Sequence, residues 1–433
     1  MLKTILQMLL RHCAKKIIKK YKPDIIGITG SIGKTSTKEA IAVVLGSKFN
    51  VRSNKKNYNN EIGMPLTIIG VEKTPGKDIF GWIKVFYKAF VLRFSRISDY
   101  PDVLVLEMGA DKPGDIEYLL EIAPCKVGVL TFIGNAHIEF FKTIKKIAQE
   151  KRLIVSHLKE DGFAVLNFDN EMVMQNAKTN AETFTYGFKD GADFQATDVN
   201  IIIDEQSFWP VGLNFKVLHR GNIVPVFLPG FIAEQFIPAA LAGLTVGHIF
   251  GINLVEGAIA LRQIKPLLGH MRIIPGIKHT LIIDDTYNSS PEAVRSALLA
   301  TAKISPQGSG KRIAILGDML ELGLDTENAH REIGFRVVEA NFDYLIVVGE
   351  ASKKFTAVAA KEAGMDENKI VVFDDSASAG KFLQNKMEKG DIILIKGSQS
   401  IRMEKIVKEV MAEPEKAEEL LVRQEEYWIR KSL

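Results

Sequence analysis

Residues 25–45, IIGITGSIGKTSTKEAIAVVL, join a short apolar run to a glycine-containing turn and a longer segment with helical periodicity. The run predicts a buried strand, and the segment from Lys34 onward predicts a helix. Glycines allow backbone N–H groups to approach a polyphosphate, and the helix adds the positive end of its dipole. This stretch therefore predicts a nucleotide phosphate site near the start of the chain.

The residues of the turn have distinct expected roles. Lys34 would reach the β- and γ-phosphates of ATP, and the Thr35 hydroxyl would bind Mg²⁺. The spacing departs slightly from the general phosphate-loop pattern, because Gly27 lies one residue too early. The predicted nucleotide-binding residues of the turn are Gly30, Ser31, Ile32, Gly33, Lys34, Thr35 and Ser36.

The composition is that of a globular protein with two or three domains. The chain has 433 residues, of which 46% are hydrophobic and 25% are charged. A net charge of +4 is too small to indicate a nucleic-acid partner. Cys13 and Cys125 are the two cysteines, which gives neither a disulfide framework nor a metal-ligand spacing and favours the cytoplasm.

Two segments combine basic and apolar residues. Residues 1–22 contain no acid and alternate apolar and basic positions at helical spacing, which predicts an amphipathic helix too short and too charged to span a bilayer. Residues 79–98 also predict a helix, with an aromatic stripe and lysines on the opposite side. Two interpretations stay open: helices packed on the protein core, or peripheral contact with the inner face of a membrane.

Strand and helix patterns alternate along most of the chain. Apolar runs at 102–110 and 125–141 favour a mostly parallel sheet covered on both faces. Residues 183–228 are more typical of antiparallel strands, and residues 231–265 are rich in helical sequence. Further strands are expected at 279–288, 311–319, 343–349, 369–373 and 391–397.

We therefore predict an α/β protein with two large domains. After the basic helix of residues 1–22, a central phosphate-loop ATPase domain spans residues 23–268, and a Rossmann-like, doubly wound domain spans residues 269–433. Ligands of such sheets lie beyond the carboxyl ends of the strands. In the second domain these ends carry Asp284, Asp285, Asn288, Asp318 and Lys396.

Glu107 and His137 are candidate metal ligands. Glu107 ends an apolar strand, where an acid is costly unless it has a partner, and a phosphate-bound magnesium needs further oxygen ligands. His137 follows the next strand, and its residue type is equally compatible with a structural role.

Eight motifs occur in order between residues 27 and about 407: GITGSIGKTST, NYNNEIGMPL, EMGADKPGDI, GNAHIEFF, DDTYNSSPEAVRSAL, ILGDMLELG, HREIG and KGSQSIRMEKIV. In this order they resemble the Mur ligase family, and most of all its members that add D-alanyl-D-alanine to a peptidoglycan precursor. The resemblance implies an ATP-dependent amide ligase of the cell wall. ATP would phosphorylate a carboxylate to an acyl phosphate, which an amine then attacks.

The resemblance also implies roles for individual residues. Glu107, His137 and a carbamylated Lys151 would hold Mg²⁺ at two sites together with Thr35, and Lys34, Lys151 and His137 would act in catalysis. Asn57, Asn59 and Asn60 match a segment that contacts the acceptor. Nucleotide contacts are implied for Asp285 and Asn288, and contacts near the incoming amine for Lys396 and Arg402.

The sequence departs from the family pattern in three places. The N-terminal domain that binds the uridine nucleotide is expected to be absent, so recognition of UDP is open and the acceptor is either a small-molecule or a lipid-linked cell-wall precursor. Gln235 takes the place of a histidine that helps to seat the nucleotide. His270 takes the place of an arginine, and Arg272 is the nearby residue that could stabilise phosphate charge instead.

Two other functions remain as alternatives. One is a related ligase acting on another acceptor, of the poly-γ-glutamate or folate type, which NNEIGMPL and DDTYNSSP argue against. The other is a weakly active ATP-binding scaffold at the membrane, against which the retention of Lys34, Thr35, Glu107, His137 and Lys151 counts. The main prediction is a cytoplasmic ligase that joins D-alanyl-D-alanine, or a similar amine, to a peptidoglycan precursor.

Overall fold

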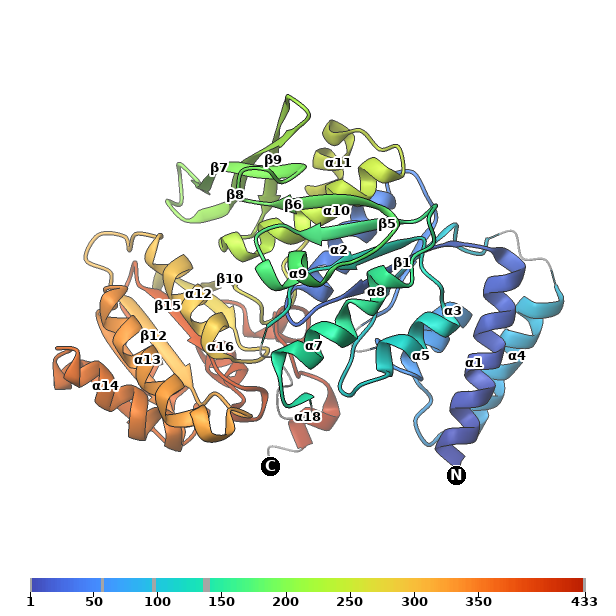
Figure 1. Cartoon of the computed structure of the whole chain (residues 1–433). Coiled ribbons are helices and arrows are strands. Elements are labelled where there is room, and N and C mark those ends of the chain that lie inside the picture. Colours follow the sequence, from blue (N-terminus) through green and yellow to red (C-terminus); the bar gives the residue numbers. More distant parts are fainter. Residues whose placement is uncertain (1, 56–57, 96–98, 135–140, 431–433) are drawn as a thin grey trace. The chain divides into compact units, whose positions relative to one another are not determined.

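The computed structural model describes residues 2–55, 58–95, 99–134 and 141–430 (Figure 1). The chain forms two compact units. Unit 1 consists of Met1–Val199, Asn214–Phe227 and Phe236–Ile264, and unit 2 consists of Asn200–Leu213, Leu228–Gln235 and Lys265–Leu433. The domain limits expected at residues 22 and 268 stay predictions.

Nine strands form the sheet that belongs mostly to unit 1, in the order β2-β3-β1-β4-β5-β6-β7-β8-β9. Strands β1 to β7 pair in parallel. The strands are β1 Asp24–Thr29, β2 Val51–Ser53, β3 Val103–Glu107, β4 Val127–Leu130, β5 Phe163–Asn167, β6 Glu182–Gly187, β7 Phe194–Ile203, β8 Pro210–His219 and β9 Asn222–Pro229.

The central strands of this sheet are buried along their whole length. Every residue of β3 and β4 is buried, which is why their sequences are continuous apolar runs rather than alternating ones. The register pairs Ile28 with Glu107 and Thr29 with Leu130, so the ends of β1, β3 and β4 meet at one edge. That edge carries the loop at residues 30–33.

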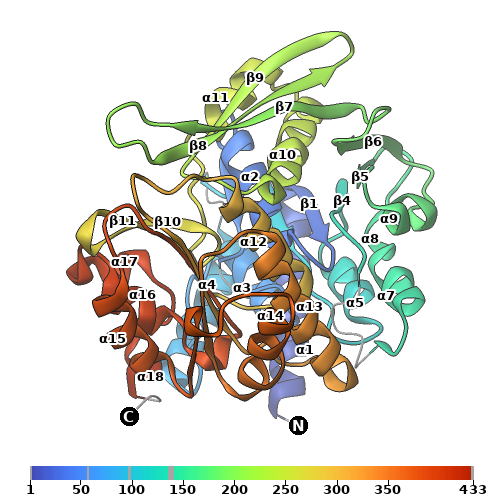
Figure 2. The same cartoon turned by 90° about the vertical axis from the view of Figure 1, so that its left-hand side faces the viewer.

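The end of the sheet departs from the parallel pattern, as the sequence predicts for residues 183–228. β8 and β9 are joined by Arg220 and Gly221 alone, both with positive φ, which is the turn geometry of an antiparallel hairpin (Figure 2). β6 is an exception within that range, because it pairs in parallel with both β5 and β7.

Helices cover unit 1. α10 packs closely on α2, the helix that follows the phosphate loop, and ten of its residues from Ile237 to Gly247 are buried. The helices are α1 Leu2–Tyr21, α2 Lys34–Leu45, α3 Gly63–Ile69, α4 Ile79–Phe94, α5 Asp115–Ile122, α7 Ile144–Lys151, α8 Leu153–Ser156, α9 Glu171–Asn176, α10 Ile237–Ile249 and α11 Leu254–Leu261, with the short 3₁₀ helix η1 at Glu234–Phe236.

The basic N-terminal helix α1 packs on unit 1 beside α4 (Figure 1). Leu10, Ala14 and Ile17 are fully buried along one side of α1. At its end, the Lys20 ammonium donates hydrogen bonds to the backbone carbonyls of Leu92, Arg93 and Ser95, which are the last carbonyls of α4 and its C-cap. Packing on the core is therefore one role of this helix, and it leaves other faces of α1 exposed.

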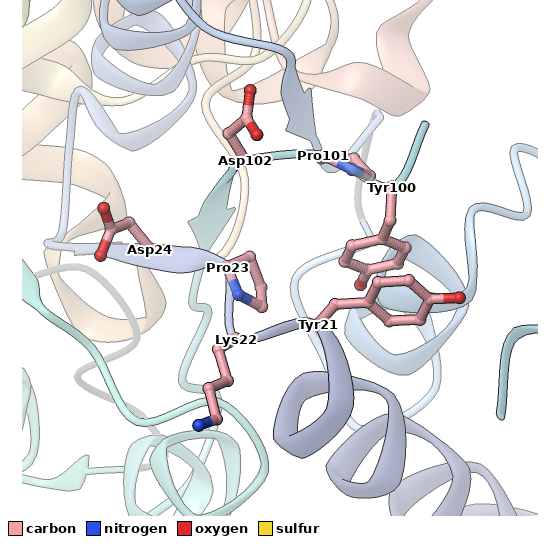
Figure 3. Close-up of a pocket in the computed structure, with 7 residues that line it drawn as sticks. All are labelled: Tyr21, Lys22, Pro23, Asp24, Tyr100, Pro101 and Asp102. Carbon is pink, nitrogen blue, oxygen red and sulfur yellow. The ribbon is translucent and has the colours of Figure 1, made fainter. Parts of the chain in front are cut away.

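A small pocket lies where α1 runs into the sheet (Figure 3). The rings of Tyr21 and Tyr100 stack with centroids 4.2 Å apart on one side of it. Its volume is about 310 Å³, and it is lined by Tyr21, Lys22, Pro23, Asp24, Tyr100, Pro101 and Asp102. Asp24 is the first residue of β1, and Asp102 directly precedes β3. The pocket is therefore at the opposite end of these strands from the phosphate loop.

Unit 2 contains a six-stranded sheet in the order β10-β11-β15-β12-β13-β14. All neighbours are parallel except β10, which is antiparallel to β11. β15 lies between β11 and β12, so the strand order reverses there, and ligands of such sheets bind beyond that point. The predicted α/β class and the doubly wound second sheet are confirmed.

The strands of unit 2 are β10 Arg272–Gly276, β11 Thr280–Asp285, β12 Arg312–Gly317, β13 Tyr344–Val348, β14 Ile370–Phe373 and β15 Ile392–Lys396. Its α-helices are α12 Pro291–Ala302, α13 Thr326–Glu339, α14 Ala357–Glu362, α15 Ser376–Lys386, α16 Glu404–Val410, α17 Ala417–Leu420 and α18 Glu426–Arg430. Shorter helical turns are η2 Ile277–His279, η3 Gly323–Asp325, η4 Ser352–Thr356, η5 Glu367–Lys369, η6 Gln399–Ile401 and η7 Pro414–Lys416. Among the described residues, none of these helices or those of unit 1 is both long and apolar enough to cross a membrane.

The two sides of α1 should differ sharply in their contribution to stability. Leu10→Ala removes a fully buried side chain and should lower the free energy of unfolding by about 2–5 kcal/mol. Met8→Ala, two residues away on an exposed position, should change it by less than about 0.5 kcal/mol. Urea unfolding followed by circular dichroism measures both, and equal effects would contradict the packing of α1 on unit 1.

Candidate active site

The loop after β1 turns directly into a helix. A Cβ atom at Gly30 would lie 2.0 Å from Thr131 Oγ1, so the close approach of the loop to the end of β4 requires glycine. Gly33 has a φ of 83°, a left-handed conformation that also favours glycine, and α2 begins at the next residue. The loop therefore leads into the N-terminus of a helix of 12 residues, an arrangement that favours bound phosphate.

Two lysine side chains converge on the backbone carbonyl of Gly30. Lys34 Nζ donates to this oxygen at 2.8 Å, and Lys151 Nζ, from the last residue of α7, donates at 3.1 Å. Burial lowers the pKa of Lys34, and burial together with the charge of Lys34 lowers the pKa of Lys151 to about 7. Because the two ammonium groups repel each other, an anion at this position would stabilise both.

Glu107 lies next to the start of α2. Its Oε2 accepts a hydrogen bond from Thr35 Oγ1 at 2.9 Å, and its Oε1 accepts one from Asn59 Nδ2 at 2.9 Å. The carboxylate is almost fully buried, both of these hydrogen-bond donors are neutral, and the nearby Lys34 interacts with its charge. A buried carboxylate with neutral donors beside a threonine hydroxyl fits a divalent cation, which would add to the positive charge of Lys34.

A second layer of polar groups fixes Glu107. Asn54 Oδ1 accepts from the backbone N–H of Glu107 at 2.8 Å, and Asn54 Nδ2 donates to the Glu107 carbonyl at 3.1 Å. The buried Lys38 in turn donates to the Asn54 carbonyl at 2.5 Å. Sequence reasoning missed Asn54, which lies three residues before the NYNNEIGMPL motif.

The other side of the loop is held by the segment after β4. Ser31 N donates to the Phe132 carbonyl at 2.7 Å, and Thr131 Oγ1 donates to the Ile32 carbonyl at 2.6 Å. Asn167, at the end of β5, donates to the Thr131 carbonyl at 2.8 Å. The loop is therefore fixed in place by two strands besides its own.

Glu150 was also missed, although it adjoins Lys151. Its two carboxylate oxygens accept from the backbone N–H groups of Gly114 and Ile116 at 2.9 and 2.8 Å, at the start of α5. This fixes the end of α7 and so the direction of the Lys151 side chain. No signal in the sequence distinguished Glu150 from an ordinary surface acid.

The predicted metal ligands are only partly assembled by the described residues. Thr35 and Glu107 are in contact, and Lys151 lies across the Gly30 carbonyl from Lys34. His137 lies outside the described residues, as does Asn57. Within the described part of the chain, no cluster of three or more histidine, cysteine or acidic residues could hold a metal.

The predicted acceptor residues play unequal parts. Asn59 donates a hydrogen bond to Glu107, whereas Asn60 Oδ1 accepts from the backbone N–H groups of Ile62 and Gly63 at the start of α3.

The remaining predicted residues of the phosphate loop differ in exposure. Ile32 is half-exposed, and Ser36 is partly buried in the first turn of α2.

In unit 2, the end of β11 meets the end of β15. Lys396 forms an ion pair with Asp285 at 2.7 Å and also donates to the Asn288 carbonyl at 2.9 Å. Asp285 Oδ1 additionally accepts from the Met271 N–H at 3.2 Å, and the Asn288 side chain is exposed. The fully buried neighbour Asp284 has its pKa raised to about 6 by burial.

Arg402 does not reach outward. Its side chain pairs with the buried Glu404 and donates to the Trp428 carbonyl at 2.9 Å. Glu404 also pairs with Arg423 at 3.2 Å, and Arg423 donates to the carbonyls of Thr286 and Tyr287. The predicted contact of Arg402 with an incoming amine would therefore require this network to open.

The two residues that depart from the family pattern, His270 and Gln235, and the neighbouring Arg272 differ in charge. His270 donates from Nδ1 to the Leu268 carbonyl at 2.9 Å and stacks on Tyr287. Burial lowers the pKa of His270, which favours the neutral ring. Arg272, at the start of β10, is partly buried. Gln235, on η1, is exposed.

Two further groups organise the loops at the carboxyl edge of unit 2. Asp318 accepts from the Ser352 N–H at 2.7 Å, which joins the ends of β12 and β13. His330 is fully buried, accepts at Nε2 from the Met319 N–H at 3.0 Å, and bonds through Nδ1 to the Thr326 carbonyl at 2.8 Å. His330 belongs to the HREIG motif, so the motif could have been used to predict it.

A glycine-containing loop that joins a parallel strand to a helix, with a buried carboxylate at the end of the adjacent strand, defines an α/β protein of the nucleotide-phosphate-binding class. Residues 89–229 match the family model described as the Mur ligase middle domain, and residues 269–399 match that of the Mur ligase, glutamate ligase domain. The chain belongs to the Mur ligase family.

Individual relatives agree with this assignment. The UDP-N-acetylmuramoyl-tripeptide–D-alanyl-D-alanine ligase of Mycobacterium leprae is 31% identical over 87% of this chain and 71% of its own length. The enzyme of the same name from Bacillus subtilis is 28% identical over 94% of this chain and 79% of its own length. The crystal structure of MurF ligase from Thermotoga maritima in complex with ADP superposes with a TM-score of 0.75 at 28% identity, covering 95% of this chain and 84% of that chain.

Lys151 should lower the stability of the folded protein below neutral pH. Its pKa is about 7 in the folded chain against an ordinary 10.5, so between these values the unfolded chain binds the extra proton. Stability should therefore rise with pH across this window, and the penalty is fully present below pH 7. In Lys151→Met both the penalty and this rise should disappear.

Urea unfolding of Lys151→Met and of Lys145→Met, at a series of pH values, tests this expectation. Lys145 is an exposed lysine of the same helix, so its removal controls for the loss of a charge from α7. If the free energy of unfolding depends on pH in the same way in both variants, the expectation of a lowered pKa for Lys151 is contradicted.

Proposed function

We propose that this protein is an ATP-dependent ligase that joins D-alanyl-D-alanine, or a similar amine donor, to the peptide of a peptidoglycan precursor through an acyl phosphate. The observation that carries the proposal is the pair of lysines on the Gly30 carbonyl beside the buried Glu107–Thr35 contact. The names of the relatives from M. leprae and B. subtilis, both D-alanyl-D-alanine ligases, support the choice of substrates.

The residues of unit 1 suit the activation of a carboxylate. The N-terminus of α2 and the Lys34 ammonium would hold the β- and γ-phosphates of ATP and neutralise charge that grows during transfer. Thr35 and Glu107 would hold Mg²⁺ with His137 and Lys151, and the ion would supply Lewis-acid stabilisation of the phosphate oxygens. Asn59 donates to the Glu107 carboxylate, and Asn54 fixes the Glu107 backbone.

Lys151 suits carbamylation because its amine is neutral in a large fraction of molecules near neutral pH. Burial and Lys34 lower its pKa to about 7, and only the neutral amine attacks CO₂. The resulting carbamate would be an anion beside Lys34, which removes the repulsion between the two ammonium groups and creates a ligand for a second Mg²⁺.

We expect the substrates to bind at the carboxyl ends of the strands in each sheet. In unit 1, Asn57, Asn59 and Asn60 would contact the acceptor. In unit 2, Asp285 and Asn288 would contact the nucleotide, and Lys396 with Arg402 would lie near the amine donor; Gln235, His270 and Arg272 are the further nucleotide contacts. His270 is uncharged by its environment, so Arg272 is the better source of positive charge.

The acceptor and the location are linked. A muramoyl peptide would present the same reacting carboxylate whether it is carried by UDP or by a membrane lipid. We infer a cytoplasmic protein, and residues 1–22 and 79–98 are the segments through which it would meet the inner face of that membrane.

Phosphate release from Mg-ATP should require two partners at once. With the wild-type protein, release should depend on both D-alanyl-D-alanine and a muramoyl tripeptide, tested in its UDP-linked and lipid-linked forms. Lys34→Met should lower kcat by about 100- to 1,000-fold, because charge on the transferring phosphoryl group loses its closest cation. Lys389→Met, at an exposed position in unit 2, is the matched control and should keep full activity.

Three outcomes would count against the ligase. ATP binding without any turnover would favour the scaffold, and turnover only with a poly-γ-glutamyl or folate acceptor would favour the other ligase type. Equal activity of Lys34→Met and Lys389→Met would remove Lys34 from the phosphate site.

The carbamate has its own spectroscopic test. After exchange of the wild-type protein into isotope-labelled bicarbonate, carbon NMR should show one protected carbamate resonance. Lys151→Arg should lack it, because the guanidinium is not nucleophilic at these pH values. Lys145→Arg should keep it, and a resonance that persists in Lys151→Arg would assign the modification elsewhere.

A further inference from the structure

Helix α4 has apolar residues on two opposite faces. Val85, Ala89 and Leu92 are buried against unit 1. Six other large apolar side chains are exposed, each between 57% and 78%: Ile79, Phe80, Ile83, Tyr87, Phe90 and Phe94. The buried face accounts for the packing of α4, so the exposed one has no structural explanation within unit 1.

The exposed side chains form one continuous surface, which we call the α4 outer face. At about 100° of rotation per residue, the six positions fall within an arc of about 100°, and the buried residues fall on the opposite side. Large apolar patches at the surface of a protein usually mark an interaction site. The α4 outer face is rich in aromatic residues, which favour the boundary between water and hydrocarbon.

Cations flank this face. Lys84 and Lys88 lie on one side of the arc, and Arg93 lies on the other. Neither α4 nor the neighbouring α1 contains an aspartate or glutamate. The pattern is therefore apolar in the middle and positive at the edges.

Helix α1 extends the pattern, because it lies beside α4 (Figures 1 and 2). Lys20 binds the last carbonyls of α4, so the two helices run in the same direction. The outward side of α1 carries the exposed apolar residues Ile5, Met8 and Leu9 in its first half and the exposed Lys15, Lys16 and Lys19 in its second half.

The lysines and the arginine of α1 divide into three groups. Lys20 is bound to the end of α4. Lys3 and Arg11 form ion pairs with Glu61 and Glu121 of unit 1. Lys15, Lys16 and Lys19 lie on the outward side and face solvent. They are therefore available to an anionic surface.

We propose that the α4 outer face, with the outward lysines of α1, docks on a membrane surface that contains anionic lipid. Phe80, Phe90 and Phe94 would enter the headgroup region, and the flanking lysines would lie at the phosphate groups of the lipids. This deepens the location proposed above and does not depend on the ligase reaction.

Charge complementarity favours a membrane over a second copy of the chain. A symmetric contact through α4 would bring Lys84, Lys88 and Arg93 of both copies together, and neither α1 nor α4 offers a carboxylate to pair with them. An anionic bilayer provides both the apolar phase and the opposite charge.

Vesicle sedimentation of the full chain, without nucleotide or substrate, tests the proposal. The protein should sediment with vesicles of phosphatidylcholine and phosphatidylglycerol and stay in solution with phosphatidylcholine alone. Phe80→Ser and Phe94→Ser should each weaken binding by about tenfold. Lys16→Gln and Lys19→Gln should each weaken it by about fivefold, and added salt should reduce these differences.

Matched controls lie elsewhere on the surface. Phe208 is 64% exposed, close to the 63% of Phe94, so Phe208→Ser controls for the loss of an exposed aromatic ring. Lys389→Gln controls for the loss of an exposed cation. All of these side chains are exposed, and unchanged melting temperatures should confirm that each variant folds.

Several results would overturn the proposal. Absence of sedimentation with phosphatidylglycerol vesicles would do so, as would equal binding by Phe94→Ser and Phe208→Ser. A dimer that forms without lipid and that Phe94→Ser disperses, seen by analytical ultracentrifugation, would assign the face to a second copy. No step of the sedimentation assay uses ATP. Its result can therefore be interpreted even if the ligase assay fails.

Discussion

The geometry of unit 1 depends on the hydrogen bonds that Lys34 and Lys151 both donate to the carbonyl of Gly30. Two ammonium groups that share one neutral acceptor repel each other, and burial removes the water that would screen them. Burial lowers the pKa of both lysines, and the charge of Lys34 lowers the pKa of Lys151 further. An arrangement of this kind persists only where the surrounding fold holds it, and it prepares the site for an anion.

The surrounding fold does hold it, through polar groups at strand ends. Thr131 excludes any side chain at Gly30, and Glu150 fixes the end of α7 that carries Lys151. Asn54 fixes Glu107 through both of its backbone groups. These residues would contact neither ATP nor the acceptor in the proposed reaction, yet they determine where the reacting groups lie.

The sequence predicts much of this arrangement, but not its supporting groups. The strand, turn and helix at residues 25–45 follow from local pattern alone, because glycine and apolar periodicity act over a few residues. The parallel order of the strands follows from the alternation of strand and helix. Asn54 and Glu150 could not be found in this way, since their roles depend on partners 53 and 36 residues away. His137 and Asn57 lie outside the described residues, so their predicted roles stay predictions.

The two faces of α4 limit what a periodicity argument can decide. An aromatic stripe in a sequence predicts that one face of the helix is shielded from water. Either the protein core or a lipid surface could shield it, and the sequence pattern does not distinguish the two. Here the stripe divides: Trp82 and Phe86 are partly buried against the core, whereas Phe90 and Phe94 are exposed. Packing on the core and contact with a membrane are therefore compatible interpretations of residues 79–98. A helix with two apolar faces can pack on the protein with one face and bind a lipid surface with the other. Unit 2 shows the contrast, since its buried cations Lys396 and Arg423 each have a carboxylate partner, whereas the outward lysines of α1 lie on a helix with no acid.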